Sequence, residues 1–206
     1  VRRFADRVEI TLPDGTVELF DQVIFACHSD QALSMLADAS QAEQQVLGGI
    51  GYQMNEVVLH TDSRILPKRK AAWAAWNYQR AASADVESAQ VCLHYLINRL
   101  QPLPVTQPVV VSLNPQRDIS PTDVLGEYEY HHPVFDLPAI RAQARVDDMQ
   151  GQRHTWFAGA WTGYGFHEDG LKSGLRAARS IIDTHGLVPM DAVDAVRRQA
   201  LPGVFA

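Results

Sequence analysis

The residues best suited to chemistry lie in one stretch, where an apolar run leads through a glycine-rich loop into a helix. The run ends in Phe157-Ala158-Gly159, the loop extends to Gly165, and helical periodicity begins at Glu168. Glycines let a backbone approach a ligand closely, and a helix N-terminus offers unpaired N–H groups with partial positive charge. Such a terminus can hold a phosphate or stabilise negative charge on a reduced flavin ring. The same pattern is also typical of an ordinary strand–helix turn, so the spacing leaves both interpretations open.

The segment after the loop has the pattern of an amphipathic helix whose first turn would face such a ligand. Apolar residues fall on one stripe over 168–186, and Gly186 can end the helix. The stripe consists of Leu171, Leu175, Ala178 and Ile182. The acidic residues Glu168 and Asp169 stand in the first turn, where the helix dipole favours negative charge.

The first third of the chain predicts a hairpin and then a strand that is buried on both faces. Residues 7–20 alternate apolar and polar around a Pro-Asp-Gly turn, which predicts a β-hairpin. Residues 21–27 form a mostly apolar run, as in a strand covered on both sides. Short helices follow, the second opened by a capping box of Ser40 and Glu43.

The middle third predicts an antiparallel sheet, and the last third returns to α/β character. Prolines and turn residues separate short β-branched or aromatic runs in the middle. These runs are 56–61, 72–78, 90–95 and 109–113. A helix is predicted over 139–149, a strand over 154–158, and a short tail helix from Pro189 to about Gln199.

Composition excludes several classes of protein. The chain has 206 residues, 46% hydrophobic and 20% charged, which suffices for a folded core. Its net charge of −6 and scattered basic residues do not suit a nucleic-acid partner. No apolar run approaches the ~20 residues of a membrane span. The two cysteines, Cys27 and Cys92, form neither a disulfide framework nor a zinc spacing, and they suit the reducing cytoplasm.

The order of residues in 157–178 resembles the C-terminal flavin-binding signature of the amine oxidase and phytoene desaturase superfamily. The matching runs are Phe157-Ala158-Gly159 and Asp169-Gly170-Leu171-Lys172-Ser173-Gly174-Leu175-Arg176-Ala177-Ala178. In that superfamily F-A-G ends a strand, and a G-x-x-x-S/A-G-x-x-A-A helix points its N-terminus at the isoalloxazine ring. Upstream, the hairpin running into Asp21-Gln22-Val23-Ile24-Phe25-Ala26-Cys27 is similar to the family segment that returns to the dinucleotide-binding sheet. The chain is most similar to bacterial amine-oxidase-like proteins predicted to bind NAD or FAD.

The resemblance implies an α/β (α+β) fold. This fold is the C-terminal part of an FAD/NAD(P)-binding Rossmann-like domain with an inserted, mainly antiparallel substrate domain. The resemblance assigns residues 1–48 to the FAD domain, where they form a hairpin, a returning strand and short helices. Residues 49–148 form the substrate domain. Residues 149–206 are the C-terminal segment of the FAD domain with the flavin-facing helix.

The resemblance also implies FAD as the cofactor and identifies the residues that contact it. These are Gly159, Ala160, Trp161, Glu168, Asp169, Gly170 and Leu171. Val1 falls about where the family has a valine whose backbone lies against the adenine. The chain contains no G-x-G-x-x-G, the motif that holds the FAD pyrophosphate in the family. The sequence therefore looks like the C-terminal half of a longer, truncated flavoprotein, and by itself it is expected to bind FAD poorly and to be inactive.

Departures from the family pattern bear on the reaction. Amine oxidases keep a lysine near flavin N5, and Asn55 takes its place here. The position of one flavin-flanking aromatic residue falls on His167, the candidate catalytic residue. Its imidazole could act as acid or base beside hydride transfer, or it could cap or pack the helix start. Ala160 replaces a small polar or acidic residue.

Other candidate residues are assigned to structure or to the lining of a substrate pocket. His131 and His132 could suggest a metal site, but neighbours on a strand point to opposite faces, so no metal is expected and the pair is assigned to one of these two roles. Trp73, Trp76 and Tyr78 are predicted to lie in the sheet core, the alternative being an aromatic cage, and Trp76 and Tyr78 share a face opposite Trp73.

Three functions follow as alternatives. The first is an FAD-dependent oxidoreductase that transfers hydride from an amine or lipid-like substrate carbon to flavin N5. The second is a flavin-dependent desaturase, saturase or isomerase that acts on an unsaturated lipid. The third is a cofactor-free, non-enzymatic fragment that self-associates through an apolar face. Apart from the small-molecule substrate, the expected partner is the missing N-terminal FAD-binding half.

Overall fold

The computed structural model describes residues 1–79 and 91–186, so the predicted tail helix from Pro189 lies outside the described residues. The chain divides into two compact units. Unit 1 comprises Val1–Gly51 and Pro133–Ala206, and unit 2 comprises Tyr52–His132. The second unit ends earlier than the predicted substrate domain, because the helix after it packs against unit 1. None of the described helices has the length and apolar composition that crossing a bilayer requires.

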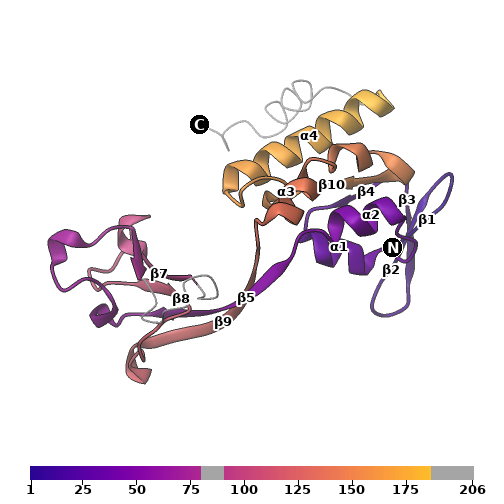
Figure 1. Cartoon of the computed structure of the whole chain (residues 1–206). Helices are drawn as coiled ribbons and strands as arrows, with labels where there is room; N and C mark the ends of the chain where they lie inside the picture. Colours follow the sequence, from indigo (N-terminus) through magenta and orange to yellow (C-terminus); the bar gives the residue numbers. More distant parts are fainter. Residues whose placement is uncertain (80–90, 187–206) are drawn as a thin grey trace, which may run out of the picture. The chain divides into compact units, whose positions relative to one another are not determined.

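Unit 1 is built on a parallel pair of strands, β4 (Val23–Phe25) and β10 (Thr155–Phe157). Their rings Phe25 and Phe157 stack with centroids 5.6 Å apart. Figure 1 shows the long helix α4 (His167–His185) on one side of this pair and the short helices α1 (Ser29–Met35) and α2 (Gln41–Leu47) on the other. A further helix, α3 (Leu137–Gln143), contacts α2.

The hairpin and the helices near it match their predictions closely. β2 (Val8–Thr11) and β3 (Val17–Phe20) pair antiparallel, and β1 (Arg2–Arg3) adds a third strand. The capping box of Ser40 and Glu43 is present at the start of α2. The helix predicted over 139–149 is instead α3 followed by a 3-10 turn, η5 (Asp147–Met149).

The edges of the parallel pair differ from one another. The side-chain amide of Gln150 accepts from Phe157 N–H at 2.9 Å and donates to the Phe157 carbonyl at 2.7 Å. It therefore occupies the outer edge of β10 as a neighbouring strand would. Within the described residues β4 pairs only with β10, so no strand covers its outer edge. The prediction that β4 is buried on both faces is wrong at Ile24, whose side chain is 49% exposed.

A buried ion pair fastens the N-terminal strand to unit 1. The Arg3 side chain is fully buried, and it bonds to Glu43, to Asp38 at 3.0 Å and to Thr155 at 3.3 Å. Its second nitrogen donates to Glu43 at 2.8 Å. Burial alone would lower the pKa of Arg3, but Glu43 and Asp38 hold it above its usual value. One cation thus connects β1, α2 and β10.

Replacing Arg3 by Met should lower the free energy of unfolding by roughly 3–5 kcal/mol, because Glu43 would remain charged and buried without its partner. The double change Arg3→Met with Glu43→Gln should recover part of this loss. Urea unfolding measures the free energy of unfolding of both variants. Arg7→Met, which removes an exposed ion pair with Asp6 and Glu9, is the control and should leave stability nearly unchanged.

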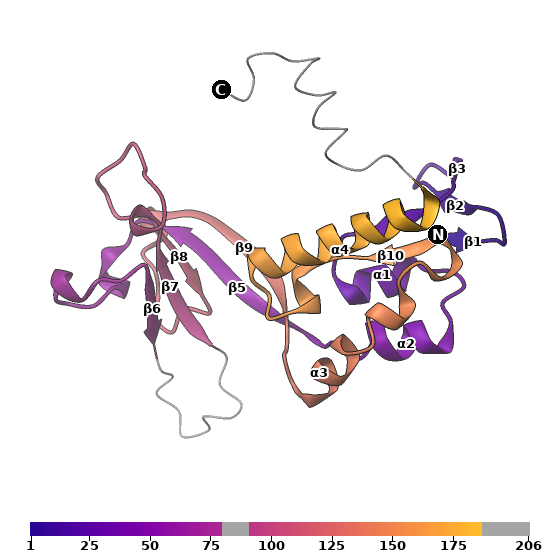
Figure 2. The same cartoon turned by 90° about the horizontal axis from the view of Figure 1, so that it is seen from above.

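Unit 2 is a five-stranded antiparallel sheet with the order β6-β7-β8-β5-β9 (Figure 2). The strands are β5 (Tyr52–His60), β6 (Trp76–Gln79), β7 (Cys92–Leu96), β8 (Val110–Leu113) and β9 (Val124–Pro133). Short 3-10 turns join them, at η1 (Ser63–Ile65), η2 (Lys70–Ala72), η3 (Ile97–Arg99) and η4 (Pro121–Asp123). The predicted run 72–78 is therefore part 3-10 turn and part strand.

The two faces of this sheet carry different side chains. On the first, here called the apolar face, two rows cross from β5 to β6. The rows are Val57, Leu113, Leu93, Tyr78 and Leu59, Val111, Tyr95, Trp76. At the β6 edge Trp76 is 54% and Tyr78 68% exposed, so the prediction that they lie in the core is wrong. Trp73 instead packs on the second face against Ile65 and Leu66.

The second face holds a buried chain of hydrogen bonds. His60 Nδ1 accepts from the Asp62 backbone N–H at 3.1 Å, so in the neutral ring Nε2 carries the hydrogen and donates to Ser112 Oγ at 2.7 Å. The Ser112 hydroxyl must then donate to His94 Nδ1, also at 2.7 Å. His94 Nε2 completes the chain by donating to the Gln79 side chain at 3.1 Å. Every donor is matched only while both histidines are neutral.

This buried chain of hydrogen bonds predicts that the protein loses stability in acid. Burial first, and then His60 and Arg117, lower the pKa of His94 to about 4, whereas an unfolded histidine titrates near its model value of 6.5. Between these values the unfolded chain binds more protons than the folded one. The free energy of unfolding therefore decreases as the pH is lowered from 6.5 to 4. The loss should be on the order of 3 kcal/mol between pH 6.5 and 4. Unfolding measured across this range should show a smaller pH dependence in His94→Gln, but an unchanged one in His131→Gln, which alters an exposed histidine.

Candidate functional site

The candidate site lies in unit 1, where the chain leaves the carboxyl ends of the two parallel strands. After β10 it forms the 3-10 turn η7 (Ala160–Thr162) and then enters α4. The indole of Trp161 is buried, and its Nε1 donates to the carbonyl of Cys27, just beyond β4, at 3.0 Å. Ligands of open α/β sheets bind at the carboxyl ends of the strands, and both loops of this edge are fixed together here.

The start of α4 is fastened to the loop by the hydroxyl of Ser173. Gly159 N–H donates to Ser173 Oγ at 2.9 Å, and the hydroxyl donates to the Gly170 carbonyl at 2.8 Å. Ser173 is buried. The first turn of the helix therefore stays beside the end of β10 without any ligand.

Two further side chains shape the loop. Asp169 Oδ2 accepts from the backbone N–H groups of Tyr164 and Phe166, each at 3.0 Å, and so caps the helix. Gln143 of α3 donates to the carbonyls of Trp161, at 2.8 Å, and Gly163, at 2.6 Å. Sequence reasoning missed Gln143, since nothing local in the sequence marks a side chain that reaches a loop 18 positions away.

The glycines of this region differ in whether the surrounding atoms leave room for a Cβ atom. A Cβ at Gly159 would lie 2.4 Å from the Trp161 indole nitrogen, and one at Gly163 would lie 2.6 Å from Asp169 Cγ. The chain's own packing therefore requires glycine at these two positions. At Gly170 the nearest atoms, both of Ala160, are 3.8 and 3.9 Å from such a Cβ. The chain's own contacts do not require glycine at 170, which fits a group lying against the helix start.

The structure brings together most of the residues predicted to contact a cofactor. Gly159, Ala160 and Trp161 lie against the first turn of α4, which contains Glu168, Asp169, Gly170 and Leu171. Glu168 is exposed and pairs with Lys172 at 3.4 Å, and Leu171 is 58% exposed. Val1 lies apart from this group. Its backbone bonds to Met35 and Ala37, and Figures 1 and 2 place the N-terminus near the opposite end of unit 1 from the start of α4.

His167 is the first residue of α4 and is exposed. The cap of the loop N–H groups is Asp169, and the acid/base role of His167 and its packing at the helix start both stay predictions. The neighbouring rings of Tyr164 and Phe166 are 70% and 58% exposed. An imidazole and two aromatic rings therefore stand beside the helix start.

Unit 2 by itself contains a polar group that joins two residues singled out in the sequence, Asn55 and His132, through Asn114, which the sequence did not mark. Asn114 Nδ2 donates to Asn55 Oδ1 at 2.8 Å, and Asn55 Nδ2 bonds to His132 Nδ1 at 3.0 Å. Both asparagines are buried, and His132 is exposed. Among residues 1–79 and 91–186, no group of three or more His, Cys, Asp or Glu could hold a metal ion.

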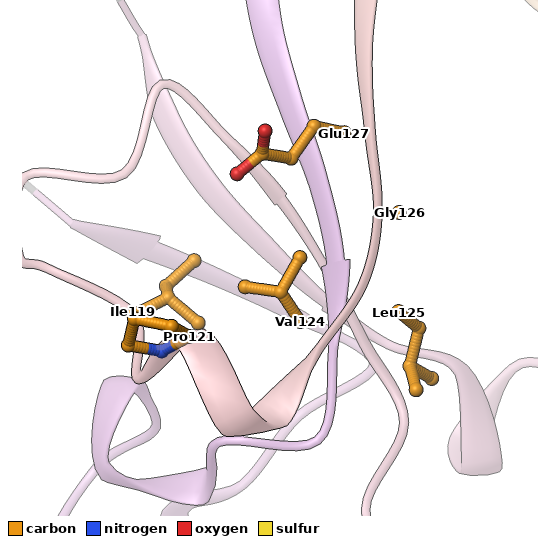
Figure 3. A pocket seen from close by; sticks show the side chains of 6 residues that line it. All are labelled: Ile119, Pro121, Val124, Leu125, Gly126 and Glu127. Carbon is orange, nitrogen blue, oxygen red and sulfur yellow. The ribbon is translucent and has the colours of Figure 1, made fainter.

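An open hollow of about 560 Å³ lies elsewhere in unit 2, at the beginning of β9. Figure 3 shows Ile119, Pro121 and Val124 along one side of it with the Glu127 carboxylate above them. It includes neither the asparagine pair nor His132.

Comparison with known proteins gives a result for the fold. A scan against protein-family models finds no match, and a search of the curated proteins finds none either. Among solved structures, a CLA-producing fatty acid isomerase from P. acnes superposes with a TM-score of 0.55 at 18% identity, over 86% of this chain and 45% of that one. A "Putative protoporphyrinogen oxidase" from Exiguobacterium sp. 255-15 gives 0.50 at 13% identity, over 88% and 45%.

At these identities the likeness establishes the fold and nothing about the reaction. The predicted α/β fold, part of a Rossmann-like domain with an inserted, mainly antiparallel domain, is confirmed. The chain spans less than half the length of either neighbour.

The difference in space around Gly170 and Gly163 can be tested by the stability of their alanine variants. Gly170→Ala should raise the free energy of unfolding by roughly 0.5–1 kcal/mol, because alanine suits a helix better and meets no close atom. Gly163→Ala should lower it by roughly 1–3 kcal/mol, because the new methyl group collides with the capping Asp169. Thermal unfolding of the two variants compares them directly. A destabilised Gly170→Ala would contradict the open space at this position.

Proposed function

We propose that this chain is part of an FAD-dependent oxidoreductase or isomerase of the amine-oxidase-like type. The observation that carries the proposal is the first turn of α4, which Ser173 and Asp169 hold at the carboxyl ends of β4 and β10 with Gly170 open. This geometry occurs in the run that resembles the superfamily's flavin-binding signature. The fold shared with an isomerase and a protein named as an oxidase agrees with it.

In this proposal the loop and helix start hold the flavin end of the cofactor. The backbone of Gly159–Trp161 and Glu168–Leu171 would contact the ring, and the partial positive charge of the helix would stabilise negative charge on it. FAD, when bound, supplies a ring that accepts hydride at N5 from a substrate carbon. His167, exposed in the same turn, would give or take the accompanying proton. Val1 lies toward the other end of unit 1, and in this proposal its backbone would meet the adenine end of the extended dinucleotide.

The apolar face of unit 2 favours a lipid-like substrate. Its two rows consist entirely of aliphatic and aromatic residues, and they cross four strands. A surface of this kind binds apolar molecules by removing their area from water. The name of the fatty acid isomerase among the structural neighbours points the same way, and so favours the desaturase, saturase or isomerase alternative.

We further propose that a second polypeptide segment completes the nucleotide site. The phosphate-binding G-x-G-x-x-G motif is absent from this sequence. Gln150 occupies the outer edge of β10, whereas the outer edge of β4 pairs with no strand among the described residues, so an added parallel strand would pair with β4. The expected partner is the N-terminal FAD-binding half of the family.

An absorption spectrum between about 300 and 550 nm tests the cofactor, first on this chain and then on a form that includes the phosphate-binding half. We expect weak or no flavin bands from the chain alone and clear bands from the longer form. A colourless longer form would contradict the proposal. A colourless chain of dimer size or larger would instead favour the self-associating fragment.

In the form that binds FAD, Gly170→Val should lower flavin occupancy, because its side chain fills the space against which the ring would lie. Arg179→Val, exposed on the same helix, introduces the same β-branched residue and should leave occupancy unchanged. Flavin content per protein is read from absorbance. Peroxide release with turnover would indicate an oxidase, and a moved double bond would indicate an isomerase.

A further inference from the structure

The outer strand β9 leaves one edge of the sheet in unit 2 open. In the order β6-β7-β8-β5-β9, β9 pairs with β5 on one side, and no strand among the described residues pairs with its other side. β9 has ten residues, and residues 127–132 are all exposed, although they alternate between its two faces. At an open edge, backbone N–H and C=O groups point away from the sheet and can bond to another strand.

β9 lacks the features that usually protect an open edge from pairing. Natural proteins shorten their edge strands or place lysine and proline on them. β9 is longer than an average strand of about 5–6 residues, and it contains no lysine. Its one proline, Pro133, is its last residue. The edge is therefore long enough, and open enough, to accept a further strand.

The order of residues in β9 makes the strand complementary to a second copy of itself. When two copies run antiparallel, the two-fold axis is perpendicular to the sheet, so each residue meets a residue of its own face. If Tyr130 stands opposite Tyr130, Glu129 of each copy faces His131 of the other. The carboxylate can accept a hydrogen bond from the imidazole at both places. Directly opposite pairs of this kind stabilise antiparallel strands.

The neighbouring registers of the two strands lose these pairs or oppose like charges. With Glu129 opposite Glu129, two carboxylates meet at the centre. With Tyr128 opposite Tyr128, Glu127 faces Glu129 at two places. With His131 opposite His131, Glu129 has no imidazole opposite it. Like charges directly opposite destabilise paired strands, so the sequence of β9 selects the register centred on Tyr130.

We infer that two copies of this chain associate along β9 in this register, so that their two five-stranded sheets become one continuous sheet. The two-fold axis places the apolar faces of both copies on the same side of that sheet, where they form one wider surface. The inference does not depend on the proposed cofactor, because no residue of the helix start or its loop takes part. The segment proposed to complete the nucleotide site joins a different edge, that of β4.

Sedimentation equilibrium of this chain tests the association, and we expect the mass of two chains. His131→Glu sets a carboxylate against Glu129 at both pairs and should weaken the dimer at least about tenfold. The exchange of the two residues, Glu129→His with His131→Glu, restores both pairs and should restore the dimer. Glu127→Lys is the matched charge reversal on the same face of β9. It should leave the dimer unchanged, because residue 127 faces Pro133 in this register.

Cysteine cross-linking tests the register itself. In a chain with Cys27→Ser, which removes the less buried of the two native thiols, Tyr130→Cys should form a disulfide-linked dimer on oxidation. Opposite residues of antiparallel strands have Cα atoms about 4.5–5.5 Å apart, which a disulfide can span. Tyr128→Cys is the matched control, because it removes the other ring of the same stacked pair. It should not cross-link, because residue 128 faces His132 of the other copy.

Three results would overturn the inference: a chain that stays monomeric, a dimer that His131→Glu leaves intact, or equal cross-linking at positions 128 and 130. Self-association through an apolar face would also give a dimer, but that dimer would persist in His131→Glu. Dimer size in a colourless chain therefore favours the self-associating fragment only if this variant keeps it. Flavin absorbance is measured separately, so failure of this inference leaves the proposed cofactor untouched.

Discussion

The parallel pairing of β4 and β10 is the constraint on which unit 1 depends. It joins segments so far apart in the chain that Trp161 and its partner Cys27 differ by 134 positions. Closing such a large loop costs conformational entropy, which burial of the stacked rings Phe25 and Phe157 must offset. Once the pair forms, the loops after both strands meet at one edge. The start of α4 can then be fixed beside them, and the candidate site follows from that placement.

Unit 2 shows how backbone donors decide the chemistry of side chains. The Asp62 N–H orients the chain through His60 and His94, and the Glu56 N–H orients the chain that ends at His132. The two histidines of the first chain are buried, and their bonds serve stability. The second chain joins two buried asparagines to the exposed ring of His132.

The proposals for the two units are consistent with one another. Unit 1 offers a helix start fixed at the ends of two strands, where the proposal puts the flavin ring, and unit 2 offers an apolar face, which the proposal assigns to the substrate. Among the described residues the outer edge of β4 pairs with no strand, which agrees with the proposal that a second segment adds to this pair.

The sequence by itself determined the local elements and the family resemblance. The hairpin over 7–20, the capping box at Ser40 and the strand–loop–helix run at 155–185 follow from turn residues, caps and periodicity, which act between neighbours in the chain. Only the tertiary structure decided which glycines are required by packing, since Gly159 and Gly163 are restricted by side chains folded back onto them. It also decided the exposure of Trp76 and the orientation of His132. Strand pairing and hydrogen-bond direction join residues distant in sequence, and no local pattern records them.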